Sequence, residues 1–61
     1  MTMYFYKFSP AKLVDAMIAL ELVGATNLSV NEVDSSITVT FDASLDETDK
    51  KLLAFYGSVE R

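Results

Sequence analysis

The sequence predicts an α+β fold, a ferredoxin-like β-α-β-β-α arrangement in which two helices cover one face of an antiparallel sheet. Two segments alternate apolar and polar residues with a period of two, as strands do, and two other segments carry helix-start and helix-stop residues. Apolar residues make up 51% of the 61 residues, with only two glycines and one proline, so we expect one packed domain over residues 1–61. A right-handed crossover would make the first two strands parallel and place the third between them.

The first expected elements are a strand over Met3–Phe8 and a helix that follows it directly. The strand segment, MYFYKF, is rich in aromatic side chains, which suit a pleated surface. Ser9 can cap the helix, and Pro10 suits the first helical position because the N–H that it lacks would have no partner there. We expect the helix to end at Val23, since Gly24 suits the left-handed residue that often follows a helix.

A hairpin is expected next, from Asn27–Val33 through a polar turn at Asp34–Ser36 to a second strand over Ile37–Asp42. In both strands the apolar side chains fall on one face and the polar ones on the other, Thr38 and Thr40 among them. This division is typical of an antiparallel sheet that is covered on one side only.

The second helix is expected over Leu45–Tyr56. Ser44 and Glu47 have the spacing of a capping box, in which each side chain accepts a hydrogen bond from the other residue's backbone N–H. Gly57 would end this helix. The remaining residues, 58–61, would form a short fourth strand or none.

This pattern resembles the heavy-metal-associated domains, small βαββαβ carriers of soft metal ions. The resemblance lies in Leu22–Asn31, a helix end and glycine leading into a strand, and in Ile37–Asp42 with a second helix opening at Ser44. In that family a Cys-x-x-Cys pair in the loop after the first strand holds the metal. Here that loop reads Phe8–Ala11, FSPA, without cysteine, so the resemblance implies the fold and not the metal-carrying function.

The composition argues against an enzyme, a cofactor and a metal site. The chain has no histidine and no cysteine, so the usual general base and the commonest soft-metal ligands are absent. Its serines fall at expected caps and turns, and glycines at positions 24 and 57 alone cannot form a phosphate-binding loop. We therefore predict no catalytic residues and no bound cofactor.

Charge and hydropathy argue against nucleic acid and membrane as partners. The formal net charge is −4, and the basic residues do not cluster as phosphate contacts require. They are Lys7, Lys12, Lys50, Lys51 and Arg61. The longest apolar run, Leu13–Val23, contains Asp15 and Glu21 and is shorter than the roughly 20 residues that span a bilayer. The N-terminal residues do not resemble a secretory signal, so a soluble cytoplasmic protein is expected.

The first strand is the expected interaction element. We expect Tyr4 and Tyr6 to point outward, because a phenol tolerates a half-wet surface better than the ring of Phe5 does. RNA binding through these rings is disfavoured because Thr38 and Thr40 stand where RNA-recognition sheets carry aromatics. If the fourth strand is short or absent, the first strand exposes an edge, and proteins usually cover or pair such edges.

The prediction is therefore a non-enzymatic protein–protein interaction module, a homodimer or the binder of another protein, that associates through its first strand and open sheet face. The residues expected at this surface are Tyr4, Tyr6, Phe8, Leu22, Val23, Thr38 and Thr40. Two alternatives remain. One is a regulatory domain that binds a small molecule or cation, with Glu21 and Asp49 as candidate polar ligands unless each merely reaches solvent at a helix end. The other is an acidic inhibitor of a protein with a basic, nucleic-acid-binding site.

Overall fold

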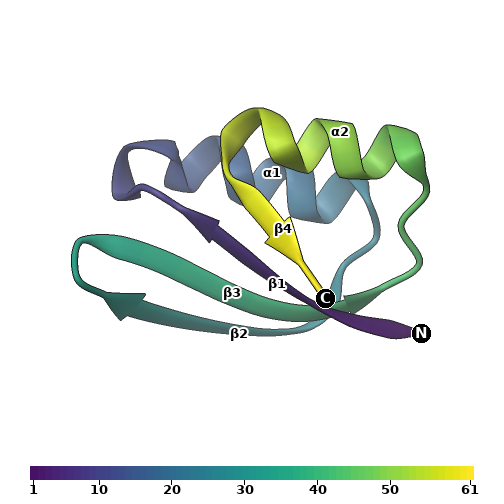
Figure 1. The fold of residues 1–61 in the computed structure, drawn as a ribbon, viewed down its shortest axis with the longest axis horizontal. Coiled ribbons are helices and arrows are strands. Elements are labelled where there is room, and N and C mark those ends of the chain that lie inside the picture. Colours follow the sequence, from purple (N-terminus) through teal and green to yellow (C-terminus); the bar gives the residue numbers. More distant parts are fainter.

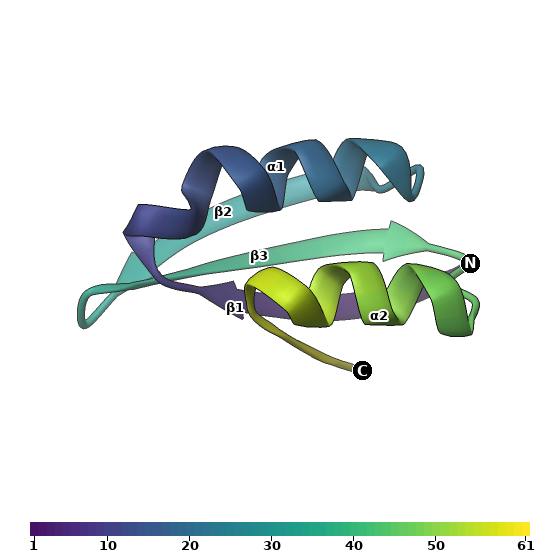
Figure 2. The same cartoon turned by 90° about the horizontal axis from the view of Figure 1, so that it is seen from above.

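The computed structural model describes residues 1–61 as a two-layer α+β structure, with two helices on one face of a four-stranded antiparallel sheet (Figure 1). In the perpendicular view α1 and α2 lie side by side above the strands (Figure 2). The elements are β1 (Thr2–Phe8), the 3₁₀ turn η1 (Pro10–Lys12), α1 (Leu13–Leu22), β2 (Thr26–Val33), β3 (Ser36–Ala43), α2 (Glu47–Tyr56) and β4 (Ser58–Glu60). Neither helix is long and apolar enough to cross a membrane.

The strands lie in the order β2-β3-β1-β4. β3 pairs antiparallel with both β1 and β2, so the third strand lies between the first two, as the crossover argument predicts. Tyr6 lies opposite Val39 in β3, and Val30 of β2 lies opposite Val39 from the other side. Directly opposed residues share a face of the sheet, so this register divides each strand into a helix-covered face and an open face.

The core lies between the helices and the sheet, and it contains the aromatic rings of β1. The eleven buried residues are Tyr4, Tyr6, Phe8, Ala16, Ala19, Leu20, Ile37, Val39, Phe41, Ala43 and Leu53. A domain of this size has little apolar area to bury, so its largest rings contribute most when they lie inside. The alternation in β3 is as expected, with Ile37, Val39 and Phe41 under the helices.

The prediction that Tyr4, Tyr6 and Phe8 face outward is wrong. Tyr4 stacks on Phe41 with 5.7 Å between ring centroids, and Tyr6 packs against Phe8 at 5.1 Å. The Tyr6 hydroxyl donates a hydrogen bond of 2.6 Å to the carbonyl oxygen of Leu53, which satisfies the phenol inside the core. Burial, with a smaller contribution from Tyr56, raises the pKa of Tyr6 to about 12. It is Phe5, 41% exposed, that lies on the open face.

The predicted short fourth strand is present, and it covers part of the β1 edge that was expected to be free. The chain end forms β4, which pairs antiparallel with β1 at Phe5, Tyr6 and Lys7. β1 is thereby an interior strand along those residues. Gly57 permits this return, because a Cβ at that position would collide with the carbonyl oxygen of Lys7 and lie 2.9 Å from Cβ of Phe8.

The helix ends follow the predicted chemistry with shifted residues. Ser9 makes no side-chain cap, and the chain enters α1 through the 3₁₀ turn that Pro10 opens. Gly24, with φ at 76°, is the left-handed residue expected after α1. The capping box of α2 is formed by Asp46 and Asp49 instead of Ser44 and Glu47, because the helix begins two residues later than expected.

The hairpin between β2 and β3 closes through a two-residue turn. Asp34 and Ser35 have φ values of 49° and 65°, and Val33 pairs with Ser36. Positive φ at both turn residues is the geometry that follows the twist of a hairpin, and glycine usually occupies the second of them. The chain therefore accepts some backbone strain at Ser35.

Candidate interaction surface between α1 and β2

Helix α1 meets the core through small side chains and leaves its large ones outside. Its buried residues are Ala16, Ala19 and Leu20, and the two alanines let the helix lie close to the sheet. The exposed apolar residues are Leu13 at 39%, Val14 at 70%, Ile18 at 52% and Leu22 at 71%. A surface helix usually presents polar side chains to solvent, so this composition is typical of a helix that contacts another molecule.

Strand β2 is exposed along its whole length, although its sequence alternates like that of a half-buried strand. Val30 lies opposite Val39, which is fully buried, so Val30 is on the helix-covered face of the sheet. Leu28, two residues earlier, is 41% exposed and Val30 is 52% exposed. The helices do not cover this strand, and its apolar face stays accessible.

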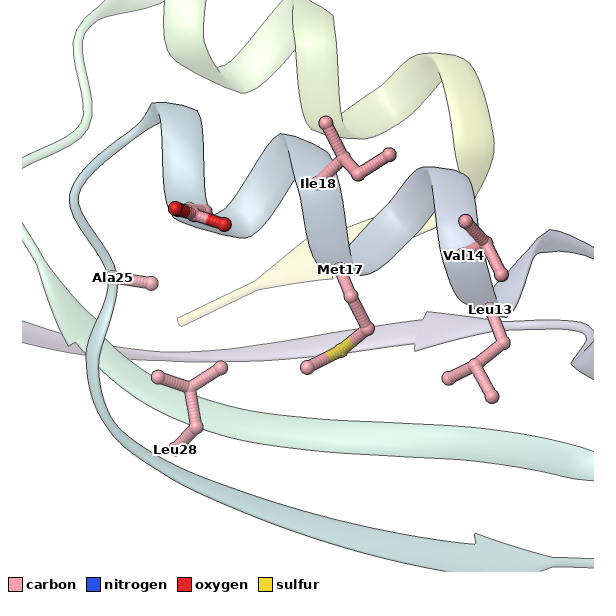
Figure 3. Close-up of a pocket in the computed structure, with 7 residues that line it drawn as sticks. Leu13, Val14, Met17, Ile18, Ala25 and Leu28 are labelled. Atoms are coloured by element: carbon pink, nitrogen blue, oxygen red, sulfur yellow. The ribbon is translucent and has the colours of Figure 1, made fainter.

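An open groove of about 500 Å³ separates α1 from β2 (Figure 3). Met17 of α1 and Leu28 of β2 point toward one another across it, and Ala25 lies in the connection between the two elements. The lining residues are Leu13, Val14, Met17, Ile18, Glu21, Ala25 and Leu28. Six of these seven residues are hydrophobic, so the groove offers apolar contact with one carboxylate among its walls.

The outer edge of β2 has no strand beside it, because β2 is the last strand of the sheet. The edge is eight residues long and contains no proline and no lysine, two residues that commonly protect such edges. Its single charged residue is Glu32, which lies opposite the buried Ile37 and therefore on the helix-covered face. Backbone N–H and C=O groups along this edge are available to another strand.

One end of this edge is irregular. The pairing of β2 with β3 shifts register between Thr26 and Ser29, and Asn27 has φ at 53°. The side-chain amide of Asn27 donates a hydrogen bond of 2.9 Å to the carboxylate of Asp42, which holds the irregular segment against β3. The regular part of the edge is thus residues 29–33.

Glu21 and Asp49 have different surroundings in the structure. Glu21 lines the groove on the α1 side. The Asp49 carboxylate accepts a hydrogen bond of 3.4 Å from the backbone N–H of Asp46, and the Asp49 N–H donates one of 2.8 Å to the Asp46 side chain. Asp49 therefore serves the start of α2. No group of three or more acidic residues that could hold a metal ion is present.

The other residues expected at an interaction surface are divided among three places. Thr38 and Thr40 lie half-buried on the open face of the sheet, as their alternation predicts. Leu22 is exposed at the end of α1, whereas Val23 packs partly against the core. Tyr4, Tyr6 and Phe8 belong to the core.

Sequence reasoning missed the groove, although one signal for it was present. The apolar residues of α1 run almost around the helix, more than one buried face can use. The alternation of β2 predicts that its apolar residues share the covered face of the sheet, but Leu28 and Val30 are 41% and 52% exposed. No protein-family model, curated protein or solved structure matches this chain, so its own surface chemistry is the basis for assigning a function.

Proposed function

We propose that this protein is a small, non-enzymatic interaction module of ferredoxin-like arrangement that self-associates, and that α1 and β2 form its interaction surface. The alternation of strands and helices and the strand order β2-β3-β1-β4 support the ferredoxin-like arrangement. The observation that carries the proposed function is the contiguity of an exposed apolar groove with an unpaired strand edge. Surfaces of this kind mark sites of contact with other proteins.

The exposed side chains would contribute free energy to association. Fully burying a Val, Leu or Ile side chain contributes roughly 1.5–3 kcal/mol. Val14 is 70% exposed and Ile18 is 52% exposed, so each retains on the order of 1–2 kcal/mol to be gained in a complex. Burial of several such residues, together with the hydrogen bonds of a strand edge, would offset the entropy cost of bringing two copies together.

Light scattering on a size-exclusion column tests this proposal. The wild-type chain should elute with a mass above the 6.8 kDa of the monomer. Val14→Asp should weaken association at least ~100-fold, because it removes apolar contact and places an unpaired carboxylate in the interface of both copies. Phe55→Asp is the matched control, since Phe55 is 79% exposed on α2 and does not line the groove.

Two results would contradict the proposed surface. One is equal association of the wild type and Val14→Asp, which would locate self-association elsewhere. The other is a wild-type chain that remains a monomer up to high micromolar concentration, which would contradict self-association.

The groove also favours a second candidate function, the binding of a small apolar molecule. Its volume of about 500 Å³ falls within the usual range of ligand pockets, roughly 300–1,000 Å³. Glu21, its only charged lining residue, would favour a ligand with a cationic group. Octylamine should then raise the thermal unfolding midpoint while octanoate does not, and Glu21→Gln should remove the difference between the two. No rise with octylamine would exclude this ligand class.

A further inference from the structure

We infer that two copies of this chain join through their β2 edges, antiparallel about a two-fold axis, so that eight strands form one continuous sheet. This inference rests on the proposed function and specifies its partner and geometry. Of the two edge strands, β2 has eight residues, whereas β4 has only three. The longer edge can form the longer ladder of hydrogen bonds.

A second β2 is the natural occupant of this edge. When a strand pairs with its own copy about a two-fold axis, each donor that it presents meets the matching acceptor of the copy. The exposed Leu28 and Val30 lie on the helix side of β2, so pairing brings the same apolar face of both copies to one side of the sheet. Each groove lies between α1 and the edge strand. Joining the edges therefore merges two grooves into one apolar space flanked by the two α1 helices.

Electrostatics selects the register of this pairing. Glu32 is the only charged residue of β2, and no lysine of the strand can neutralise it. If Val30 lies opposite its counterpart, Leu28 faces Glu32 of the copy, and the two Glu32 side chains are four residues apart along the strands. At ~3.4 Å per residue this separation is about 14 Å, which exceeds the Debye length at physiological ionic strength. Centring on Asn31 would bring the two carboxylates to ~7 Å.

The Val30-centred register also suits the regular part of the strand. It places the irregular segment at Thr26 and Asn27 at the outer ends of the new ladder, opposite or beyond Val33 of the copy. On the open face Ser29 lies opposite Asn31, two polar side chains that can hydrogen-bond. The two valines meet on the apolar face.

The exposed surface matches what a stable dimer requires. A standard interface takes about 800 Å² from each partner, of which about 57% is apolar. That is about a fifth of the 4026 Å² of accessible surface on this chain. The exposed apolar residues at the groove and beside it offer on the order of 400 Å², close to the apolar share. They are Leu13, Val14, Ile18, Leu28 and Val30.

Disulfide trapping tests the geometry, because the chain has no cysteine of its own. Val30→Cys should form a covalent dimer under mild oxidation, since directly opposed Cβ atoms lie ~4.5–5.5 Å apart, near the separation in a disulfide. Ser29→Cys should cross-link at least ~10-fold more slowly, because its counterpart lies diagonally at ~7–8 Å. Phe55→Cys, exposed on α2, measures random collision.

The outcomes separate this inference from the proposed function. If the wild type is dimeric but Val30→Cys cross-links no faster than Phe55→Cys, self-association stands and β2 pairing is overturned. Fastest cross-linking at Asn31→Cys would overturn the Val30-centred register. A monomeric wild type would overturn both.

Hydrogen exchange of the unmodified chain gives a readout that does not depend on a variant folding. Among residues 29–33, the amides whose N–H groups point away from β3 should exchange at least ~10-fold more slowly at a concentration where the dimer dominates than at one where the monomer does. The amides of β4 serve as the internal comparison. Unchanged exchange in β2 across the monomer–dimer transition would overturn the inference.

Discussion

Replacing Tyr6 with phenylalanine tests the inward placement of the β1 aromatics. The substitution keeps the ring that packs in the core and removes the hydroxyl that donates 2.6 Å to the carbonyl oxygen of Leu53. That oxygen also accepts the backbone N–H of Gly57 at 3.2 Å, so it keeps one partner after the change. The cost is therefore the net value of one hydrogen bond, about 1 kcal/mol, and not the larger penalty of an orphaned carbonyl.

Urea denaturation followed by far-ultraviolet circular dichroism measures this cost, with all variants at one protein concentration because self-association contributes to stability. Tyr56→Phe is the matched control, because Tyr56 is half-buried and its hydroxyl makes no hydrogen bond. Tyr6→Ala should cost roughly 3–5 kcal/mol, since it empties a large site in the core. If Tyr6→Phe and Tyr6→Ala both match the wild type within ~0.5 kcal/mol, Tyr6 lies at the surface and the inward placement is refuted.

Three further predictions concern pH and the backbone. Because the folded-state pKa of Tyr6 is raised to about 12 from 10.0, its contribution to stability is complete below pH 10 and is lost as pH rises toward 12. The free energy of unfolding, measured as the pH is raised, should show this loss in the wild type and a smaller loss in Tyr6→Phe. Gly57→Ala should lower the free energy of unfolding in urea by ~1–3 kcal/mol, because the new Cβ would collide with the β1 backbone. Gly24→Ala places its Cβ more than 4 Å from any other atom, so it should lower the free energy by only ~1–2 kcal/mol, the cost of a positive φ for alanine. Ser35→Gly should raise the free energy of unfolding by ~0.5–1 kcal/mol, because glycine adopts a φ of 65° without strain. Ser44→Gly is the control and should not stabilise the protein. Equal effects of the two substitutions would show that the turn is unstrained.

The order of elements could be predicted because each carries local signals. Pro10, Gly24 and Gly57 mark helix ends, and the alternation in Ile37–Asp42 assigns that strand's two faces correctly. The shift of the α2 capping box arises because Asp46 and Asp49 offer the same chemistry as Ser44 and Glu47 two residues later. The local sequence alone does not show which of the two capping boxes begins α2.

The orientation of β1 was not predictable in the same way. Its residues are aromatic or long on both faces, so alternation alone gives no polarity. The choice depends on which rings the helices can cover and on the Leu53 carbonyl that receives the Tyr6 hydroxyl. Both are long-range features. β4 is likewise too short, at three residues, to carry a periodic signal, and it forms because β1 offers an edge beside Gly57.

The proposed interaction surface, at α1 and β2, differs from the one predicted at the first strand for the same reason. Leu22 and Val23 at the end of α1 were expected at the surface, but the alternation in β2 predicts one covered face for that strand, and the two ten-residue helices leave β2 exposed along its length. α1 leaves Leu28 and Val30 accessible. The placement of the helices determines which apolar residues remain exposed. The sequence indicates this exposure only through an excess of apolar residues around α1.

The association state of the wild-type chain in solution tests the central claim most directly. Sedimentation equilibrium across the micromolar range should yield a mass that approaches twice the 6.8 kDa of one chain as concentration rises, with Val14→Asp remaining at 6.8 kDa throughout. A wild-type mass that stays at 6.8 kDa up to high micromolar concentration would contradict self-association through α1 and β2.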